Sequence, residues 1–149
     1  LLGTDDKLNM YMYQADSLFG KWKLHKKPKV IIGSESRCGG RIFADNKGLL
    51  LPIQNSSNGY GFGVSLYRLS FKDGNYKIKR ENPFFLKRHT NLKEFNAGMH
   101  HFDIQKIGDT YYYVYDGNRL ENTEKIWNIK GALKMNYCDF KNWWYQNFN

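Results

Sequence analysis

Two arginines that flank a Cys-Gly-Gly turn are the side chains of this sequence best suited to hold a ligand. Arg37 and Arg41 precede Gln54, which ends a short apolar run, and Tyr60, which stands between two glycines. Forked donors, an amide and an aromatic ring near the ends of short strands suit planar, hydroxyl-rich molecules, and guanidinium groups also pair with anionic oxygens. This stretch therefore predicts a site for a glycan or a nucleotide sugar.

Three carboxylates near strand ends or turns are candidates for acid–base chemistry. Glycosidic cleavage in most families uses two carboxylates, about 5 Å apart for retention and roughly 6.5 to 9.5 Å apart for inversion. Glu35 and Asp103 are the catalytic candidates. Glu35 can equally be an ion-pair partner of Arg37, and Asp116, just before Gly117, is either a substrate contact or a turn former.

Two adjacent histidines precede one of these carboxylates. Neighbouring strand residues point to opposite faces, so His100 and His101 cannot chelate one ion, whereas His101 and Asp103 share a face. That pair can orient a sugar hydroxyl or exchange a proton, or it can be a structural hydrogen bond. The usual metal and nucleotide signatures are missing from the sequence, so we predict neither a metal nor a cofactor. Cys38 and Cys138 predict two free thiols, as in a reducing, cytoplasmic compartment.

Composition predicts one basic, sheet-rich domain. The 149 residues include 17% aromatic side chains and carry a net charge of +9, which attracts polyanions. The basic aromatic segment 21–29, KWKLHKKPK, is either a solvated strand face or part of a nucleic-acid-binding module, which is the less favoured alternative. No apolar run reaches the roughly 20 residues that a membrane-spanning helix needs.

Alternating apolar residues and Gly turns predict antiparallel strands over most of the chain. The second strand is expected to end before Pro28, and Trp22 is expected in the core. Asp73-Gly74 is expected to form a tight hairpin turn. The predicted strands cover residues 8–13, 22–25, 41–44, 49–53, 62–71, 76–81, 99–107 and 110–115.

The strands group into units typical of β-propeller blades, which are four-stranded antiparallel sheets of about 40 to 50 residues. The units span residues 1–35, 36–87 and 97–120, followed by an uncertain tail, 121–149. About three blades fit this length, so we predict a single all-β domain, a partial propeller that lacks N-terminal blades.

A short C-terminal helix is predicted in the tail. Ile126, Ile129 and Leu133 fall at helical spacing behind Thr123, a candidate N-cap. The aromatic stretch 142–145 is expected to be a further strand or an exposed patch normally covered by other chain.

Five motifs in order, ESRCGGRIF, LPIQNSS, NGYG, GMHHFD and VYDG, resemble the N-terminal propeller domain of glucosamine inositolphosphorylceramide transferases and related bacterial polysaccharide-biosynthesis proteins. More broadly, the chain resembles five-bladed propellers of the arabinanase, levansucrase and invertase type. The resemblance covers about residues 10–117. It implies a ligand site at the propeller axis, lined by Arg37, Arg41, Gln54, Tyr60 and His100, and an attached transferase domain or the missing propeller blades as partner.

Our leading interpretation is a carbohydrate-active domain that binds a glycan or nucleotide sugar in glycan biosynthesis or processing. The first alternative is a glycoside hydrolase that cleaves O-glycosidic bonds with paired carboxylates. The second alternative is the nucleic-acid-binding module.

Overall fold

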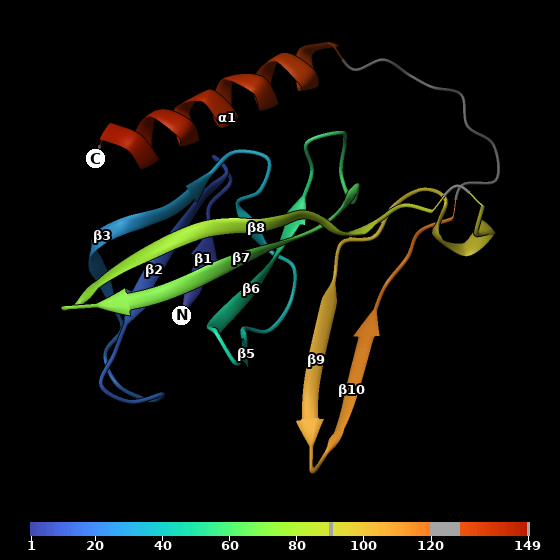
Figure 1. Cartoon of the computed structure of the whole chain (residues 1–149). Coiled ribbons are helices and arrows are strands. Elements are labelled where there is room, and N and C mark those ends of the chain that lie inside the picture. Colours follow the sequence, from blue (N-terminus) through green and yellow to red (C-terminus); the bar gives the residue numbers. More distant parts are fainter. Residues whose placement is uncertain (90, 120–128, 149) are drawn as a thin grey trace.

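The described residues fold into antiparallel sheets followed by a 20-residue helix (Figure 1). A computed structural model describes residues 1–89, 91–119 and 129–148. The first sheet contains β1 (Leu2–Thr4), β2 (Asn9–Gln14) and β3 (Lys23–Ile32). The second sheet contains β4 (Arg37–Cys38), β5 (Phe43–Asp45), β6 (Gly48–Asn55), β7 (Gly63–Lys72) and β8 (Asn75–Lys87). The 3₁₀ helix η1 (Lys93–Phe95) leads to the third sheet, a hairpin of β9 (Phe102–Ile107) and β10 (Thr110–Tyr115), and the helix α1 (Ile129–Phe148) comes last.

The first sheet has the order β1-β2-β3, and its middle strand alternates as predicted. Met10 and Met12 are buried, while Tyr11 and Tyr13 are partly exposed. The prediction that the second strand ends before Pro28 was wrong, because β3 continues to Ile32. Between the pairs Tyr13↔Leu24 and Tyr11↔Lys29 the register shifts, so Pro28 lies in an irregular segment where its missing N–H costs no ladder hydrogen bond.

The second sheet has the order β4-β6-β7-β8, with β5 also paired to β6. The hairpin between β7 and β8 forms where Asp73-Gly74 predicts it. Both residues have positive φ, 51° and 68°, as a two-residue turn of this kind requires. β8 runs to Lys87, well past the predicted end at residue 81.

The first two sheets share one hydrophobic core. Its buried members are Met10, Met12, Val30, Ile31, Leu51, Ile53, Tyr67, Leu69 and Tyr76. Trp22 does not join them: it is 38% exposed and donates its indole N–H to the carbonyl of Leu18 at 3.3 Å, so the expectation of a core tryptophan was wrong. Tyr76 instead connects the sheets, because its hydroxyl lies 2.8 Å from the carbonyls of both Lys27 and Lys29.

The β9–β10 hairpin attaches to the second sheet near its base and extends away from it (Figure 1). The Phe102 amide donates to the carbonyl of Gly39 at 2.7 Å, and the Phe102 ring lies against Phe85, with a 4.9 Å centroid distance. Tyr111 to Tyr115 are all exposed. The base of the hairpin thus meets the second sheet at the Cys-Gly-Gly turn and at Gly61, whose carbonyl accepts the Met99 amide at 2.6 Å.

Helix α1 lies along the first sheet and covers the edge of β3 (Figure 1). Asn142 accepts the Ile32 amide at 2.8 Å, and Gln146 donates to the Val30 carbonyl at 2.5 Å. Of the two expectations for residues 142–145, the strand was wrong, since the helix continues through them, whereas Trp143 and Trp144 are exposed as an aromatic patch. The predicted Thr123 cap and Ile126 lie outside the described residues.

The described residues therefore form an all-β fold with one C-terminal helix, as predicted, and their sheets close into no barrel. Cys38 and Cys138 are free thiols. The arrangement of the sheets as blades around a propeller axis stays a prediction.

Candidate functional site

The Cys-Gly-Gly turn brings the predicted site residues of the second and third sheets together. Arg37 pairs with Gln54 across β4 and β6. A Cβ on Gly39 would lie 2.9 Å from the backbone nitrogen of Gln54 and 3.2 Å from the backbone carbonyl oxygen of His100. A Cβ on Gly40 would overlap the Phe102 carbonyl. The glycines are therefore required for the backbone around residues 100–102 to approach this turn.

Tyr60, His100 and Asp116 form one cluster beside this turn. The Tyr60 and His100 rings meet edge to face, with centroids 5.5 Å apart, and His100 Nδ1 faces Asp116 Oδ2. Asp116 Oδ1 accepts the backbone amides of both His100 and His101 at 2.8 Å. Asp116 therefore links the segment before β9 to the segment after β10 at the base of the hairpin. The His101 side chain is exposed.

Arg41 and Asp103 form an exposed ion pair. Arg41 Nη2 lies 3.3 Å from Asp103 Oδ2, and Asp103 Oδ1 accepts the Ile104 amide at 2.9 Å. Arg41 is 57% exposed at its side chain, and exposed pairs of this kind contribute little stability. Asp103 therefore faces Arg41, and its proposed catalytic role with His101 stays a prediction.

Glu35 is buried and accepts hydrogen bonds from three strands. Its Oε1 accepts from Asn55 Nδ2 at 3.1 Å and from the Ser65 hydroxyl. Its Oε2 accepts from the Tyr67 hydroxyl at 2.5 Å and from Arg80 Nη1 at 2.9 Å. This carboxylate fastens the loop before β4 to β6, β7 and β8, so the expected ion-pair partner is Arg80 rather than Arg37.

The Tyr67–Glu35 contact predicts a loss of stability in alkali. Burial, followed by the negative charge of Glu35, raises the pKa of Tyr67 well above its ordinary value of 10.0. The folded chain therefore keeps this phenol protonated where the unfolded chain ionises it. Its contribution is fully present below pH about 10, and the free energy of unfolding then falls by at most about 1.4 kcal/mol per pH unit.

Urea unfolding at several pH values above about 9 will measure this slope. Tyr67→Phe should make the slope shallower, because the variant has no phenol to ionise at this position. Tyr112→Phe removes an exposed phenol from β10 and should leave the slope as in the parent chain. Equal slopes for Tyr67→Phe and the parent chain would contradict the prediction.

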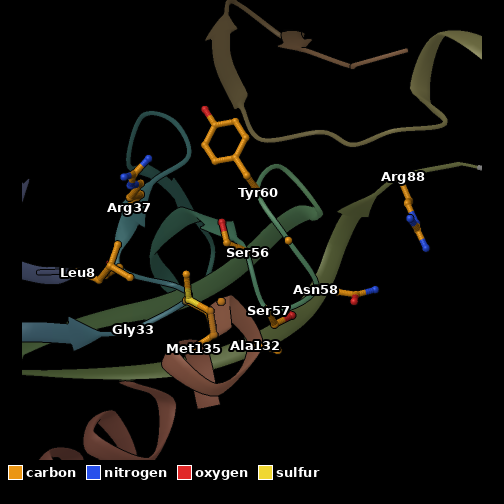
Figure 2. Close-up of a pocket in the computed structure, with 14 residues that line it drawn as sticks. Leu8, Gly33, Arg37, Ser56, Ser57, Asn58, Tyr60, Arg88, Ala132 and Met135 are labelled. Carbon is orange, nitrogen blue, oxygen red and sulfur yellow. The ribbon is translucent and has the colours of Figure 1, made fainter. Parts of the chain in front are cut away.

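A cavity of about 660 Å³ opens between the start of β4, the loop after β6 and the first turns of α1. Figure 2 shows Arg37 and Arg88 on opposite sides of it, with Ser56 and Ser57 between them. The other lining residues are Leu8, Gly33, Ser34, Ser36, Asn58, Gly59, Tyr60, Gly131, Ala132 and Met135. The lining thus combines two cations, hydroxyl groups and a small apolar wall.

Some polar groups in and beside the cavity have no ion-pair or hydrogen-bond partner among the described residues. In the described part of the chain, no carboxylate lies within ion-pair distance of Arg37 or Arg88. The hydroxyl of Ser36, a residue only 1% exposed, has no hydrogen-bond partner there, and neither does Gln54 Oε1. Buried polar atoms without partners are costly, so a ligand or water that supplies hydrogen bonds here is favoured.

Of the nine predicted site residues, Arg37 and Tyr60 line the cavity, and none of its described lining residues is acidic. Sequence reasoning missed Arg88, which follows β8 directly. The guanidinium carbon of Arg88 lies 5.6 Å from the centroid of the Phe62 ring. Sequence reasoning also missed the wall from α1, including Met135. Arg88 lies between the predicted strands 76–81 and 99–107, and no local pattern distinguishes it from the basic residues around it.

The sequence matches the family described as glucosamine inositolphosphorylceramide transferase 1, N-terminal, over residues 1–118. The chain belongs to this family. The match to this family covers all three sheets and ends before α1. The expected resemblance to these transferases is thereby confirmed.

Two curated relatives of this chain are rice proteins. The chain is 25% identical over 130 residues to glucosamine inositolphosphorylceramide transferase 1 of Oryza sativa subsp. japonica and, equally, to that of subsp. indica. Each alignment covers 79% of this chain and 17% of the relative, so the chain spans about a sixth of the length of these curated relatives. No solved structure matches the chain.

Proposed function

We propose that this domain binds an anionic sugar ligand, a charged glycan or a nucleotide sugar, in the cavity between Arg37 and Arg88. The observation that carries the proposal is the charge of the lining. Two arginines that have no carboxylate partner among the described residues face a cavity whose described lining has no acidic side chain. A ligand with phosphate or carboxylate oxygens would supply the missing partners through charge-assisted hydrogen bonds.

The rest of the lining fits the sugar part of such a ligand. The hydroxyl of Ser36 and the polar loop 56–58 offer hydrogen bonds to hydroxyl groups, and the ring of Tyr60, which is 65% exposed, offers a flat apolar face. Leu8 and Met135 provide apolar contacts beside them. A concave site with a few convergent polar groups is the usual form of a small-molecule site.

The geometry favours binding over cleavage. Glu35 is occupied by four donors inside the second sheet, and Asp103 is paired with Arg41 at the exposed base of the hairpin. Neither lines the cavity. The hydrolase alternative, which needs two carboxylates beside the scissile bond, finds no such pair in the described lining.

The family match supports a place for this domain in glycan or sphingolipid biosynthesis. The curated relatives are named as transferases and are much longer than this chain. We infer that the domain acts together with a transferase domain. It would hold the sugar-bearing molecule and present it to that domain. Additional propeller blades are the second partner that the resemblance implies.

Titration calorimetry of the 149-residue chain with uridine diphosphate sugars and with the free sugars will test the site. The charged ligand is expected to bind more tightly. Arg37→Ala and Arg88→Ala should each weaken its binding about tenfold to a hundredfold, the effect of removing a hydrogen bond to a charged group. Arg37→Lys should recover part of the loss, because it keeps the charge without the fork.

Arg41→Ala is the matched control, since Arg41 belongs to the same turn but does not line the cavity. It should leave affinity within about twofold of the parent chain. Affinity that is unchanged in both Arg37→Ala and Arg88→Ala, or equal for charged and free sugars, would overturn the proposal.

A further inference from the structure

Helix α1 carries a continuous apolar face that no described part of the chain covers. Its residues recur at spacings of four, four, three, four and four, which places them along one side of a helix. They are Ile129, Leu133, Tyr137, Phe140, Trp144 and Phe148, and each is more than half exposed. We call this set the aromatic face of α1. Exposed apolar surface of this extent marks an interaction site.

The orientation of this face is fixed by hydrogen bonds on the opposite side of the helix. Asp139 accepts both the amide and the hydroxyl of Ser34, at 3.0 and 2.8 Å. Asn142 and Gln146, three and seven residues further along, bind the backbone of β3. The helix therefore contacts β3 and the loop after it through the side that carries these polar residues and the buried Cys138, and it leaves its aromatic face outward.

The aromatic side chains along this face pack on one another. The Trp144 and Phe148 rings lie 4.5 Å apart, and Phe140 stacks on the neighbouring Trp143 at 5.9 Å. Trp143 is itself 53% exposed, so it widens the apolar surface. Tryptophan and tyrosine are the side chains that concentrate at the boundary between water and lipid.

The accessible charge next to the aromatic face is positive. The helix has three lysines, Lys130, Lys134 and Lys141, and its single carboxylate, Asp139, is bound to Ser34. Lys141 Nζ lies 5.6 Å from the Tyr137 ring centroid. From β3, Lys27 Nζ lies 5.7 Å from the Tyr145 ring centroid. A row of cations thus borders the apolar surface.

We propose that the aromatic face of α1 docks on an anionic lipid surface, with the helix lying in the plane of the headgroups. Its 20 residues span about 30 Å, which is long enough for many side chains to enter the interface together. No described helix is long and apolar enough to cross a bilayer. A second copy of the chain is a poorer occupant, since a symmetric contact would bring the lysine rows of two chains of charge +9 together.

Cosedimentation of the full chain with phosphatidylcholine vesicles, with and without phosphatidylserine, tests the proposal. Binding is expected to require phosphatidylserine and to weaken with salt. Lys134→Gln and Lys141→Gln should each lower the partition coefficient about fivefold, and Trp144→Ala about tenfold, through loss of charge and of apolar area.

Matched controls separate this surface from general charge and hydrophobicity. Lys77→Gln and Lys79→Gln on β8 remove the same charge, and Phe19→Ala removes an aromatic side chain that is 97% exposed in the loop before β3. These variants should bind as the parent chain does. Circular dichroism will verify that every variant retains its helix.

Three results would overturn the inference. One is no difference between vesicles with and without phosphatidylserine. Another is equal loss of binding in the helix and control variants. The third is equal binding of vesicles by the parent chain and by Trp144→Ala, when Trp144 is required instead for another contact. That contact would be a dimer seen in sedimentation or binding to a single-stranded oligonucleotide.

Discussion

Replacing Glu35 by alanine is expected to lower the free energy of unfolding by about 3 kcal/mol. The substitution removes the acceptor of the buried Tyr67 hydroxyl and of the Arg80 guanidinium, and it leaves the Ser65 hydroxyl with the Pro83 carbonyl, at 2.8 Å, as its acceptor. Breaking a fully buried ion pair costs about 3 to 5 kcal/mol. The lower end applies because the Arg80 side chain is 52% exposed and can recover water.

Urea denaturation of the parent chain and variants measures this cost. Glu35→Gln should lose less, since an amide keeps one acceptor oxygen in place. Glu81→Ala is the control on the same sheet. Glu81 pairs with Arg68 at 2.8 Å but is exposed, so its substitution should cost much less stability than Glu35→Ala. Parent-like stability of Glu35→Ala together with loss of sugar turnover would favour the catalytic role over the structural one.

Local patterns predicted most strands because the side chains that alternate are also those that pack. Asp73-Gly74 and the alternation around Met10 both depend on neighbours along the chain. The helix is readable in the same way, because Ile129 to Phe148 keep one helical spacing throughout. The strand alternative for residues 142–145 failed because it judged the aromatic residues by strand propensity without extending that spacing.

The expectations that failed depend on contacts distant in the sequence. β3 passes Pro28 because the register shifts there and because Tyr76, nearly 50 residues away, binds the carbonyls on both sides of it. Trp22 is exposed because the strand it precedes packs through His25 and the later residues Val30 to Ile32. No local signal contains that information.

The candidate site shows the same division. The residues of the turn at Arg37 could be found from their types, and the structure brings Gln54, Tyr60 and His100 near that turn. The burial of Glu35 could not be found, because it follows from donors on three strands that only tertiary packing assembles. The wall that α1 adds to the cavity is likewise a tertiary feature.

Gly40→Ala is expected to cost about 3 kcal/mol and to loosen the β9–β10 hairpin from the second sheet. A methyl group there would overlap the Phe102 carbonyl, and Gly40 also has a φ of 153°. Relief of the overlap requires the backbone at Phe102 to move. The hydrogen bond from its amide to Gly39 would then lengthen, and exchange of that amide with solvent should accelerate.

Gly48→Ala separates backbone strain from collision, since Gly48 has a φ of 124° but nothing within 4 Å of an added Cβ. It should cost about 1 kcal/mol, with Phe102 exchange as in the parent chain. Because His100 and Asp116 move with the hairpin, the NMR signals of His100 should shift in Gly40→Ala alone. Equal effects of the two substitutions on stability and exchange would show that the close approach at Gly40 does not hold the hairpin.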